Sequence, residues 1–94
     1  MSGGDAKPAQ AGTLESMDCL VTIERAEKGR MVEISGSGAT RFRSAMTAKV
    51  NAVLDTLSVS VPVRVHVQDN GAQDIVLGAR VEAAYRRFAG GVSR

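Results

Sequence analysis

The sequence predicts a small α+β protein, a two-layer sandwich in which two helices pack on one face of a short sheet, in the order β-β-α-β-α. Residues 61–67 alternate strictly between valine and other residues, which is typical of a strand with one buried face. Residues 19–24 and 31–35 are rich in β-forming residues and predict two further strands. Residues 40–57 and 74–88 instead repeat apolar side chains every three or four positions, as helices packed on a core do.

The two N-terminal strands are expected to form an antiparallel hairpin. Cys19, Val21 and Ile23 would share one face of the first strand. Residues 27–30 supply the turn, with Gly29 at a position that needs positive φ.

The ends of the chain are expected to lie outside the domain. Residues 1–10 consist mainly of Gly, Ala, Pro and polar residues and predict a flexible tail, residues 11–89 the domain, and residues 90–94 a C-terminal tail. The first ten residues hold no apolar run, so neither a signal peptide nor a membrane anchor is expected. Cys19 is the single cysteine, which favours a reducing compartment, and we expect a soluble, cytoplasmic protein.

The first helix has the most regular pattern in the chain. Thr40 is expected to cap it, and it is expected to end near Leu57. Its predicted buried face comprises Phe42, Ala45, Met46, Val50, Val53, Leu54 and Leu57. Pro62 lacks an N–H group and therefore belongs at the start of the third strand or on an edge of the sheet.

The last helix follows a turn signal at residues 69–71. Asp69 or Asp74 is expected to cap this helix, which would run to about Phe88. The pair of glycines at residues 90–91 is expected to end it.

Residues that commonly carry catalysis or bind metals are scarce. The chain has one His, one Cys and no Trp, and no His/Cys/Asp/Glu group has metal-ligand spacing. It has no Gly-rich phosphate loop after a strand and no Gly-x-Ser-x-Gly elbow. We therefore expect no catalytic residue and no metal site. With 94 residues, the chain is more suited to presenting a group than to enclosing a substrate.

The charge is unevenly distributed along the chain. The formal net charge is +2, but residues 1–40 carry four Lys/Arg against six Asp/Glu, and residues 41–94 carry eight against four. One hypothesis is therefore a small α+β module that binds anions or nucleic acid through the basic half. Its candidate residues are Arg41, Arg43, Arg86 and Arg87. Because these arginines are scattered with few aromatic neighbours, the pattern favours a solvated helix surface over a nucleic-acid site.

Ser16 is the candidate functional residue. It lies in the stretch Gly12-Thr13-Leu14-Glu15-Ser16-Met17-Asp18. Taken alone, a serine here is most simply a turn or cap residue. With no His near it in sequence, its hydroxyl is a poor nucleophile but a suitable acceptor when another enzyme supplies the base.

Two segments of the sequence resemble a known family. Residues 11–23, which contain Ser16, resemble the N-terminal signature of the acyl carrier (gamma) subunit of bacterial citrate lyase. Residues 67–74 and 79–84 resemble the C-terminal signature of the same family. The order and separation of the signatures fit, and the resemblance covers roughly residues 9–89.

The resemblance implies that Ser16 carries 2'-(5''-phosphoribosyl)-3'-dephospho-coenzyme A, joined covalently by a phosphodiester. The thiol of this arm would hold acetyl and citryl groups as thioesters. The residues that would support attachment are Gly12, Thr13, Leu14, Glu15 and Asp18. The carrier itself would catalyse nothing, so it would not be an enzyme on its own.

The implied partners are other proteins of citrate metabolism. They are the alpha subunit (citrate:acyl-carrier transferase), the beta subunit (citryl lyase) and a prosthetic-group transferase (holo-carrier synthase). No membrane or nucleic-acid partner is expected. Related carriers serve malonate decarboxylase and citramalate lyase, and the motif leaves these alternatives open. The strand pattern also argues against the four-helix bundle of fatty-acid-type acyl carriers, and Ser16 is expected on a loop before the first hairpin strand.

Overall fold

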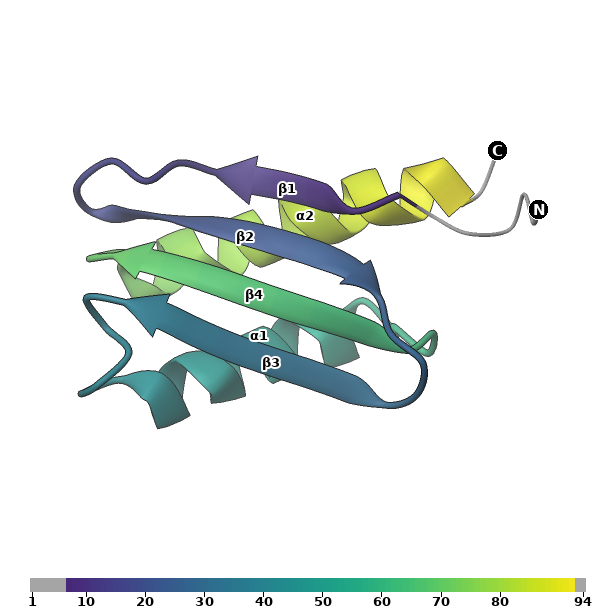
Figure 1. Cartoon of the computed structure of the whole chain (residues 1–94), viewed down its shortest axis with the longest axis horizontal. Helices are drawn as coiled ribbons and strands as arrows, with labels where there is room; N and C mark the ends of the chain where they lie inside the picture. The colour runs from purple at the N-terminus through teal and green to yellow at the C-terminus, as the bar shows by residue number, and fades with distance from the viewer. Residues whose placement is uncertain (1–6, 93–94) are drawn as a thin grey trace.

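The computed structural model describes residues 7–92, and side chains for residues 7–90. A four-stranded sheet carries two helices on one face (Figure 1), which confirms the predicted α+β sandwich and is not a helical bundle. The elements are β1 (Ala9–Gly12), β2 (Asp18–Arg25), β3 (Arg30–Gly36), α1 (Arg43–Thr56), β4 (Val63–Asn70) and α2 (Asp74–Val92). No helix among residues 7–92 is long and apolar enough to cross a bilayer.

The order of strands in the sheet is β1-β2-β4-β3, and it corrects the predicted hairpin. β4 lies between β2 and β3, antiparallel to β2 and parallel to β3. The side chains of Val63, Val65 and Val67 in β4 are fully buried. Burial of this kind is typical of a central strand, whose backbone is hydrogen-bonded on both sides. The connection from β3 to β4 runs through α1, as parallel neighbours require. Gly29 has the expected positive φ, 71°, but it joins two strands that do not pair.

Strand β1 is an element that sequence analysis missed. It pairs antiparallel with β2, with Gln10 opposite Thr22. The side chain of Arg87 on α2 donates to the carbonyl of Gln10 at 2.5 Å. The expected boundary between residues 10 and 11 therefore falls inside a strand, and the observed order is β-β-β-α-β-α. Residues 1–6 of the expected tail lie outside the described residues.

The helix ends differ from the predicted ones. Phe42, not Thr40, occupies the N-cap position of α1, without a side-chain capping bond. Its backbone is instead held by the preceding turn, because Phe42 N–H donates to the Gly38 carbonyl at 2.8 Å. Phe42 itself is exposed, whereas it was expected in the core. At the other end of the chain, α2 continues to Val92, so the prediction that the glycines at residues 90–91 end the helix is wrong. A glycine ends a helix when it adopts the left-handed conformation, and the helical backbone continues here.

The core lies between the sheet and the helices. Its side chains are almost all aliphatic, and its one aromatic ring among the described residues is that of Phe88. The predicted inward face of β2 is confirmed, because Cys19, Val21 and Ile23 are fully buried. Pro62 immediately precedes β4, where its missing N–H costs no ladder bond.

Candidate functional site

Ser16 lies on the loop that connects β1 to β2. This loop is at the end of the molecule where β3 and β4 also finish (left side of Figure 1). Ser16 is exposed, and so are Leu14 and Met17 beside it, with 56% and 62% of their surface accessible. The prediction that Ser16 lies on a loop before the Cys19-containing strand is confirmed, although that loop is itself the turn of a hairpin formed by β1 and β2.

A tight turn sets the position of Ser16. The N–H of Asp18 donates to the carbonyl of Glu15 at 3.2 Å, which places Ser16 and Met17 at the two central positions. Met17 has a φ of 67°, as the second central residue of a type II turn does. The neighbouring end of β4 holds the turn, because Met17 N–H donates to the Asn70 carbonyl at 2.7 Å. The Asn70 side-chain amide in turn donates to the Leu14 carbonyl at 2.9 Å.

Asp18 is the centre of the bonds that hold the loop. Arg80 of α2 donates to both of its carboxylate oxygens, Nε to Oδ1 and Nη2 to Oδ2, each at 3.0 Å. Thr13 Oγ1 donates to Oδ2 at 2.7 Å, and the N–H of Cys19 donates to Oδ1 at 2.7 Å. The hydrogen bonds from Arg80 and then from Thr13 hold the pKa of Asp18 far below its ordinary value of 3.8. The same pairing raises the pKa of Arg80, so both groups stay charged around neutral pH.

Gly12 is the glycine that allows β1 to approach β2 where the loop begins. Its φ is 98°, which side-chain-bearing residues rarely adopt. A Cβ at this position would lie 1.9 Å from the Cys19 carbonyl oxygen and 3.1 Å from Cδ of Arg80. The loop can therefore close against Arg80 only with glycine at position 12.

The structure divides the predicted motif into two groups. Gly12, Thr13 and Asp18 form the base of the loop, and Thr13 is exposed there, as are Leu14, Glu15 and Ser16 further along the loop. Thr13 bridges the two groups, because its Oγ1 also accepts from the N–H of Glu15 at 3.1 Å.

Two residues that organise the loop lie far away in the sequence. Arg80 is 62 positions from Asp18, and Asn70 is 56 positions from Leu14. Sequence analysis did not predict that the guanidinium of Arg80 contacts the loop. The one signal in the sequence is that Asn70 and Arg80 lie in residues 67–74 and 79–84, the segments that carry the C-terminal part of the family resemblance.

His66 and Cys19, the single histidine and the single cysteine of the chain, both lie in the sheet. His66 hydrogen-bonds through Nε2 with Ser35 Oγ at 3.1 Å, within the sheet. Cys19 is buried, and desolvation raises the pKa of its thiol to about 11, so it is not a nucleophile at neutral pH. No group of three or more His, Cys, Asp or Glu among residues 7–92 could hold a metal ion.

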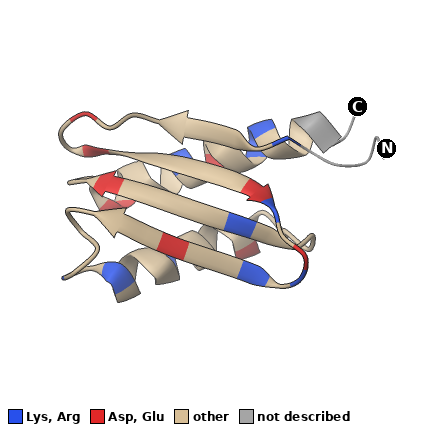
Figure 2. Ribbon diagram, viewed as in Figure 1, with Lys and Arg blue, Asp and Glu red and all other residues tan. Residues whose placement is uncertain are grey.

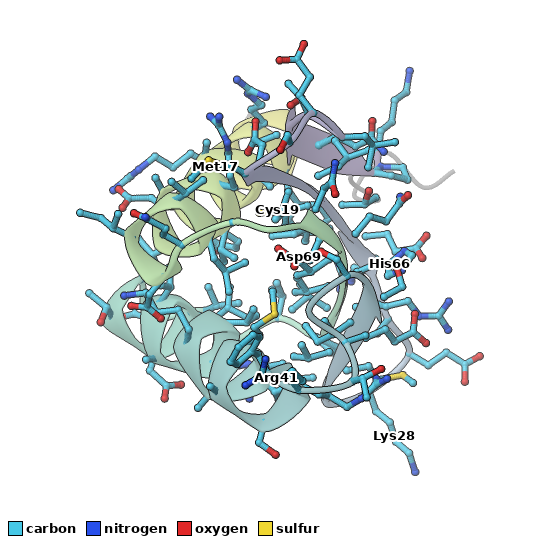
Figure 3. The ribbon with its side chains drawn as sticks, turned by 90° about the vertical axis from the view of Figure 1, so that its left-hand side faces the viewer. Met17, Cys19, Lys28, Arg41, His66 and Asp69 are labelled. Carbon is cyan, nitrogen blue, oxygen red and sulfur yellow. The ribbon has the colours of Figure 1, made fainter. Side chains whose placement is uncertain are left out.

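A cavity of about 320 Å³ opens at the same end of the molecule. It lies between the start of α1 and the end of β4, and its lining includes Phe42, Met46, Leu77, Asp69 and Gly71. Figure 3 looks directly at this end and shows Met17 and Asp69 on it. Gly71 joins the cavity to the Ser16 loop, because a Cβ placed on Gly71 would lie 3.6 Å from Met17 Cα.

Asp69 is the buried acid of this cavity, with 6% of its surface exposed. It was predicted to belong to a turn or to cap the last helix. Instead it lies in β4, and its Oδ1 accepts from Ala72 N–H at 2.9 Å. Its Oδ2 accepts from Gly71 N–H at 3.1 Å and from Ser37 Oγ at 3.3 Å.

Ser16 is thus exposed on a hairpin loop that the Asp18–Arg80 pair braces. Comparisons with known proteins identify the family of the chain. A protein-family model described as "Malonate decarboxylase delta subunit (MdcD)", an acyl carrier model, matches residues 6–88. The chain belongs to this family of acyl carrier proteins.

Curated relatives carry the name citrate lyase acyl carrier protein. The relative from Treponema denticola is 37% identical over 81 residues, which is 86% of this chain and 91% of that protein. A relative from Haemophilus influenzae is 42% identical over 81 residues, covering 86% of this chain and 83% of that protein. One from Clostridium perfringens is 34% identical over 82 residues, covering 86% and 80%.

Solved structures share the fold. A chain of a Pseudomonas malonate decarboxylase hetero-tetramer in complex with malonate superposes with a TM-score of 0.66 at 20% identity, covering 90% of this chain and 91% of that one. Homoserine kinase from Cytophaga hutchinsonii contains a similar region, with a TM-score of 0.58 at 11% identity, covering 89% of this chain and 34% of that one. At these identities the likeness concerns the fold alone.

Proposed function

We propose that this protein is the acyl carrier (gamma) subunit of a citrate-lyase-type complex, and that Ser16 is the covalent attachment point of its phosphoribosyl-dephospho-coenzyme A arm. The observation that carries the proposal is the braced loop: three motif residues form its base and Ser16 is exposed at its turn. Relatives named citrate lyase acyl carrier protein at 34% to 42% identity support the choice of complex.

The residues around Ser16 fit a group attached by a phosphodiester. The hydroxyl is exposed at one end of the molecule, so the added negative charge remains in water. The nearby cation, Arg80, donates to both carboxylate oxygens of Asp18. This pairing favours a role for Arg80 in holding the loop over a role in binding the phosphate of the arm. When attached, the group supplies the thiol on which acyl groups are carried.

The chain's own contribution is to position this arm, and the proposal assigns the reactions to other subunits. Transfer of citrate to the arm would belong to an alpha subunit, and cleavage of the citryl thioester to a beta subunit. The base that activates Ser16 for modification would come from the prosthetic-group transferase, because His66 and Cys19 are engaged elsewhere in the sheet. A tethered arm raises the local concentration of the acyl group at those active sites.

Intact mass spectrometry tests the attachment. Protein isolated from a host that makes the complex should carry the mass of the dephospho-coenzyme-A-derived group, and Ser16→Ala should remove it. Ser60→Ala, another exposed serine in a loop, is the matched control and should keep the full adduct. Wild-type protein without any adduct in such a host contradicts the proposal.

A malonate decarboxylase carrier is the second candidate. The family model and the similar chain in the Pseudomonas hetero-tetramer favour it. Both candidates, and a citramalate lyase carrier, share the proposed arm, so the adduct mass does not separate them. Affinity purification with the tagged chain does: citrate transferase and citryl lyase subunits support the proposal, and decarboxylase subunits support the alternative.

The anion-binding or nucleic-acid alternative finds little support. Arg43 donates to the Ile34 carbonyl at 3.1 Å, Arg86 pairs with Glu82 at 2.8 Å, and Arg87 bonds to Gln10. Arg41 lies 5.2 Å from the centre of the Phe42 ring. Figure 2 shows basic and acidic residues interspersed over the visible face, without the continuous basic stripe that a nucleic acid needs.

A further inference from the structure

We propose that the cavity between α1 and β4 is a resting site for the arm on Ser16, and that it takes the adenine ring of that arm. This inference rests on the proposed attachment and goes beyond it, because it gives the carrier a bound state when no partner subunit is present. Its basis is the position, the size and the polarity of the cavity.

The position of the cavity places it within reach of a group on Ser16. Ser16 is next to Met17, and a Cβ built on Gly71 at the cavity rim would lie 3.6 Å from Met17 Cα. Since neighbouring Cα atoms are about 3.8 Å apart, the Cα atoms of Ser16 and Gly71 are separated by no more than about 9 Å. The adenosine of the arm is attached through one phosphoribosyl unit, so its ring can reach the rim without the rest of the arm following it.

The size and lining of the cavity suit a single flat ring. Its volume of about 320 Å³ is at the lower end of the range for small-molecule sites, roughly 300–1,000 Å³, and is too small for the whole arm. Phe42 lines the cavity with 52% of its surface exposed, and Met46 and Leu77 supply further apolar surface. An aromatic ring and a thioether are favourable neighbours for a heteroaromatic base.

The carboxylates of the cavity disfavour binding of a phosphate and favour binding of an uncharged group that donates hydrogen bonds. Asp69 and Asp74 both line the cavity; Lys49 pairs with Asp74 at 3.1 Å, whereas no salt bridge to Asp69 is found among the described residues, so an anionic group would meet the carboxylate charge of Asp69. Asp69 receives three hydrogen bonds, from Ser37, Gly71 and Ala72, whereas a carboxylate offers about four acceptor positions. The remaining position can accept from an uncharged amino group such as that of adenine.

Tethering makes a weak site sufficient. A ligand on a short flexible linker has an effective concentration on the order of millimolar, so a site with a dissociation constant of about 1 mM is occupied roughly half of the time. Such a site holds the arm in the free carrier and yields it to a partner that binds it more tightly.

Nuclear magnetic resonance of the modified protein tests this inference. We compare ¹⁵N-labelled protein whose mass shows the adduct with Ser16→Ala protein, and monitor the amides of Gly38, Met46 and Leu77 in the cavity. The adduct should shift these amides, and protons of the adenine ring should show Overhauser contacts to the Met46 methyl group. Shifts confined to residues 13–18 and 70–71 would overturn the resting site.

A variant that fills the cavity supplies the control. Ala45 lines the cavity from an exposed position on α1, so Ala45→Trp should occupy it while the helix stays folded. The adduct-dependent shifts at Gly38 and Leu77 should then disappear. Ala48→Trp, an exposed position on the same helix outside the cavity lining, should retain them.

Three further results would contradict the adenine site in the cavity. Contacts from the pantetheine end instead of the adenine would overturn the choice of ring, and shifts that arise only after a partner subunit is added would assign the cavity to that partner. Protein without any adduct contradicts the proposed function itself, and this result is visible in the mass before any spectrum is recorded.

Discussion

Two hydroxyl groups in the β1–β2 loop occupy different environments. Thr13 Oγ1 donates to Asp18 at 2.7 Å and accepts from the N–H of Glu15, so modifying it would break two bonds that hold the loop. Ser16 lies at the exposed turn. The Ser16 hydroxyl can therefore be modified without breaking these two hydrogen bonds, whereas the Thr13 hydroxyl cannot.

Replacing Gly12 tests the close approach that the loop needs. Gly12→Ala should lower the free energy of unfolding by about 2 kcal/mol or more, because its Cβ would lie 1.9 Å from the Cys19 carbonyl oxygen at a φ of 98°. Gly29→Ala is the matched control: its φ is also positive, 71°, but nothing lies within 4 Å of the added Cβ, so a loss of about 1 kcal/mol is expected. Urea denaturation measures both, and equal losses would contradict the steric role of position 12.

The ion pair between Asp18 and Arg80 predicts a pH dependence. The folded state lowers the pKa of Asp18, so the stabilisation is complete above the ordinary value of 3.8 and is lost as the pH falls towards the lower folded pKa. The difference in stability between wild type and Asp18→Asn should therefore be constant from about pH 7 to pH 5 and shrink between about pH 5 and pH 2. Denaturant titrations across this range measure it. A difference that does not change below pH 5 would mean that the charged carboxylate is not what braces the loop.

Among the elements, the strand β4 shows what sequence pattern can and cannot predict. Its alternating valines identified it as a strand with one buried face, and Val63, Val65 and Val67 are buried. The pattern carries no information about which strands lie beside it, so two strands close in sequence were predicted to pair although β4 lies between them. Pairing is decided by the burial of β4 and by the crossover through α1, which are properties of the whole sheet.

Strand β1 and the base of the loop were missed for a related reason. The residues Ala-Gln-Ala-Gly of β1 have little β propensity, and they form a strand because β2 offers an edge and α2 packs behind them. The motif around Ser16 could be recognised in the sequence because its residues are contiguous. The contact of Arg80 with Asp18 joins residues 62 positions apart, and only the fold brings them together.

The buried face of β4 gives a prediction at the scale of the element. Val65→Ala should reduce the free energy of unfolding by about 2 kcal/mol, because Val65 is fully buried at the centre of the sheet. Val61→Ala belongs to the same alternating run but precedes the strand and is 37% exposed, so it should cost less than about 1 kcal/mol. Thermal or denaturant unfolding measures both variants. Similar losses would contradict the position of the core.

At the scale of the whole molecule, the Ser16 loop and the cavity lie at the same end. The chain measures 40 × 23 × 20 Å, and the Ser16 loop and the ends of β3 and β4 lie at one end of its long axis (Figures 1 and 3). Residues of this end, among them Gly38, Asp69 and Gly71, line the cavity. The turn between β2 and β3, which contains Lys28, is at the opposite end. A partner that contacts the Ser16 end need not contact the turn between β2 and β3.

We propose that the loop presents Ser16, and no other hydroxyl, for covalent attachment. Fragmentation mass spectrometry of the tryptic peptide that ends at Arg25, from protein made in a host with the complex, tests this proposal. We predict a dephospho-coenzyme-A-derived adduct localised to Ser16, with the hydroxyl of Thr13 unmodified. An adduct on Thr13 would contradict the proposal. So would an unmodified Arg25 peptide together with an adduct on another tryptic peptide, such as the one that contains Ser37.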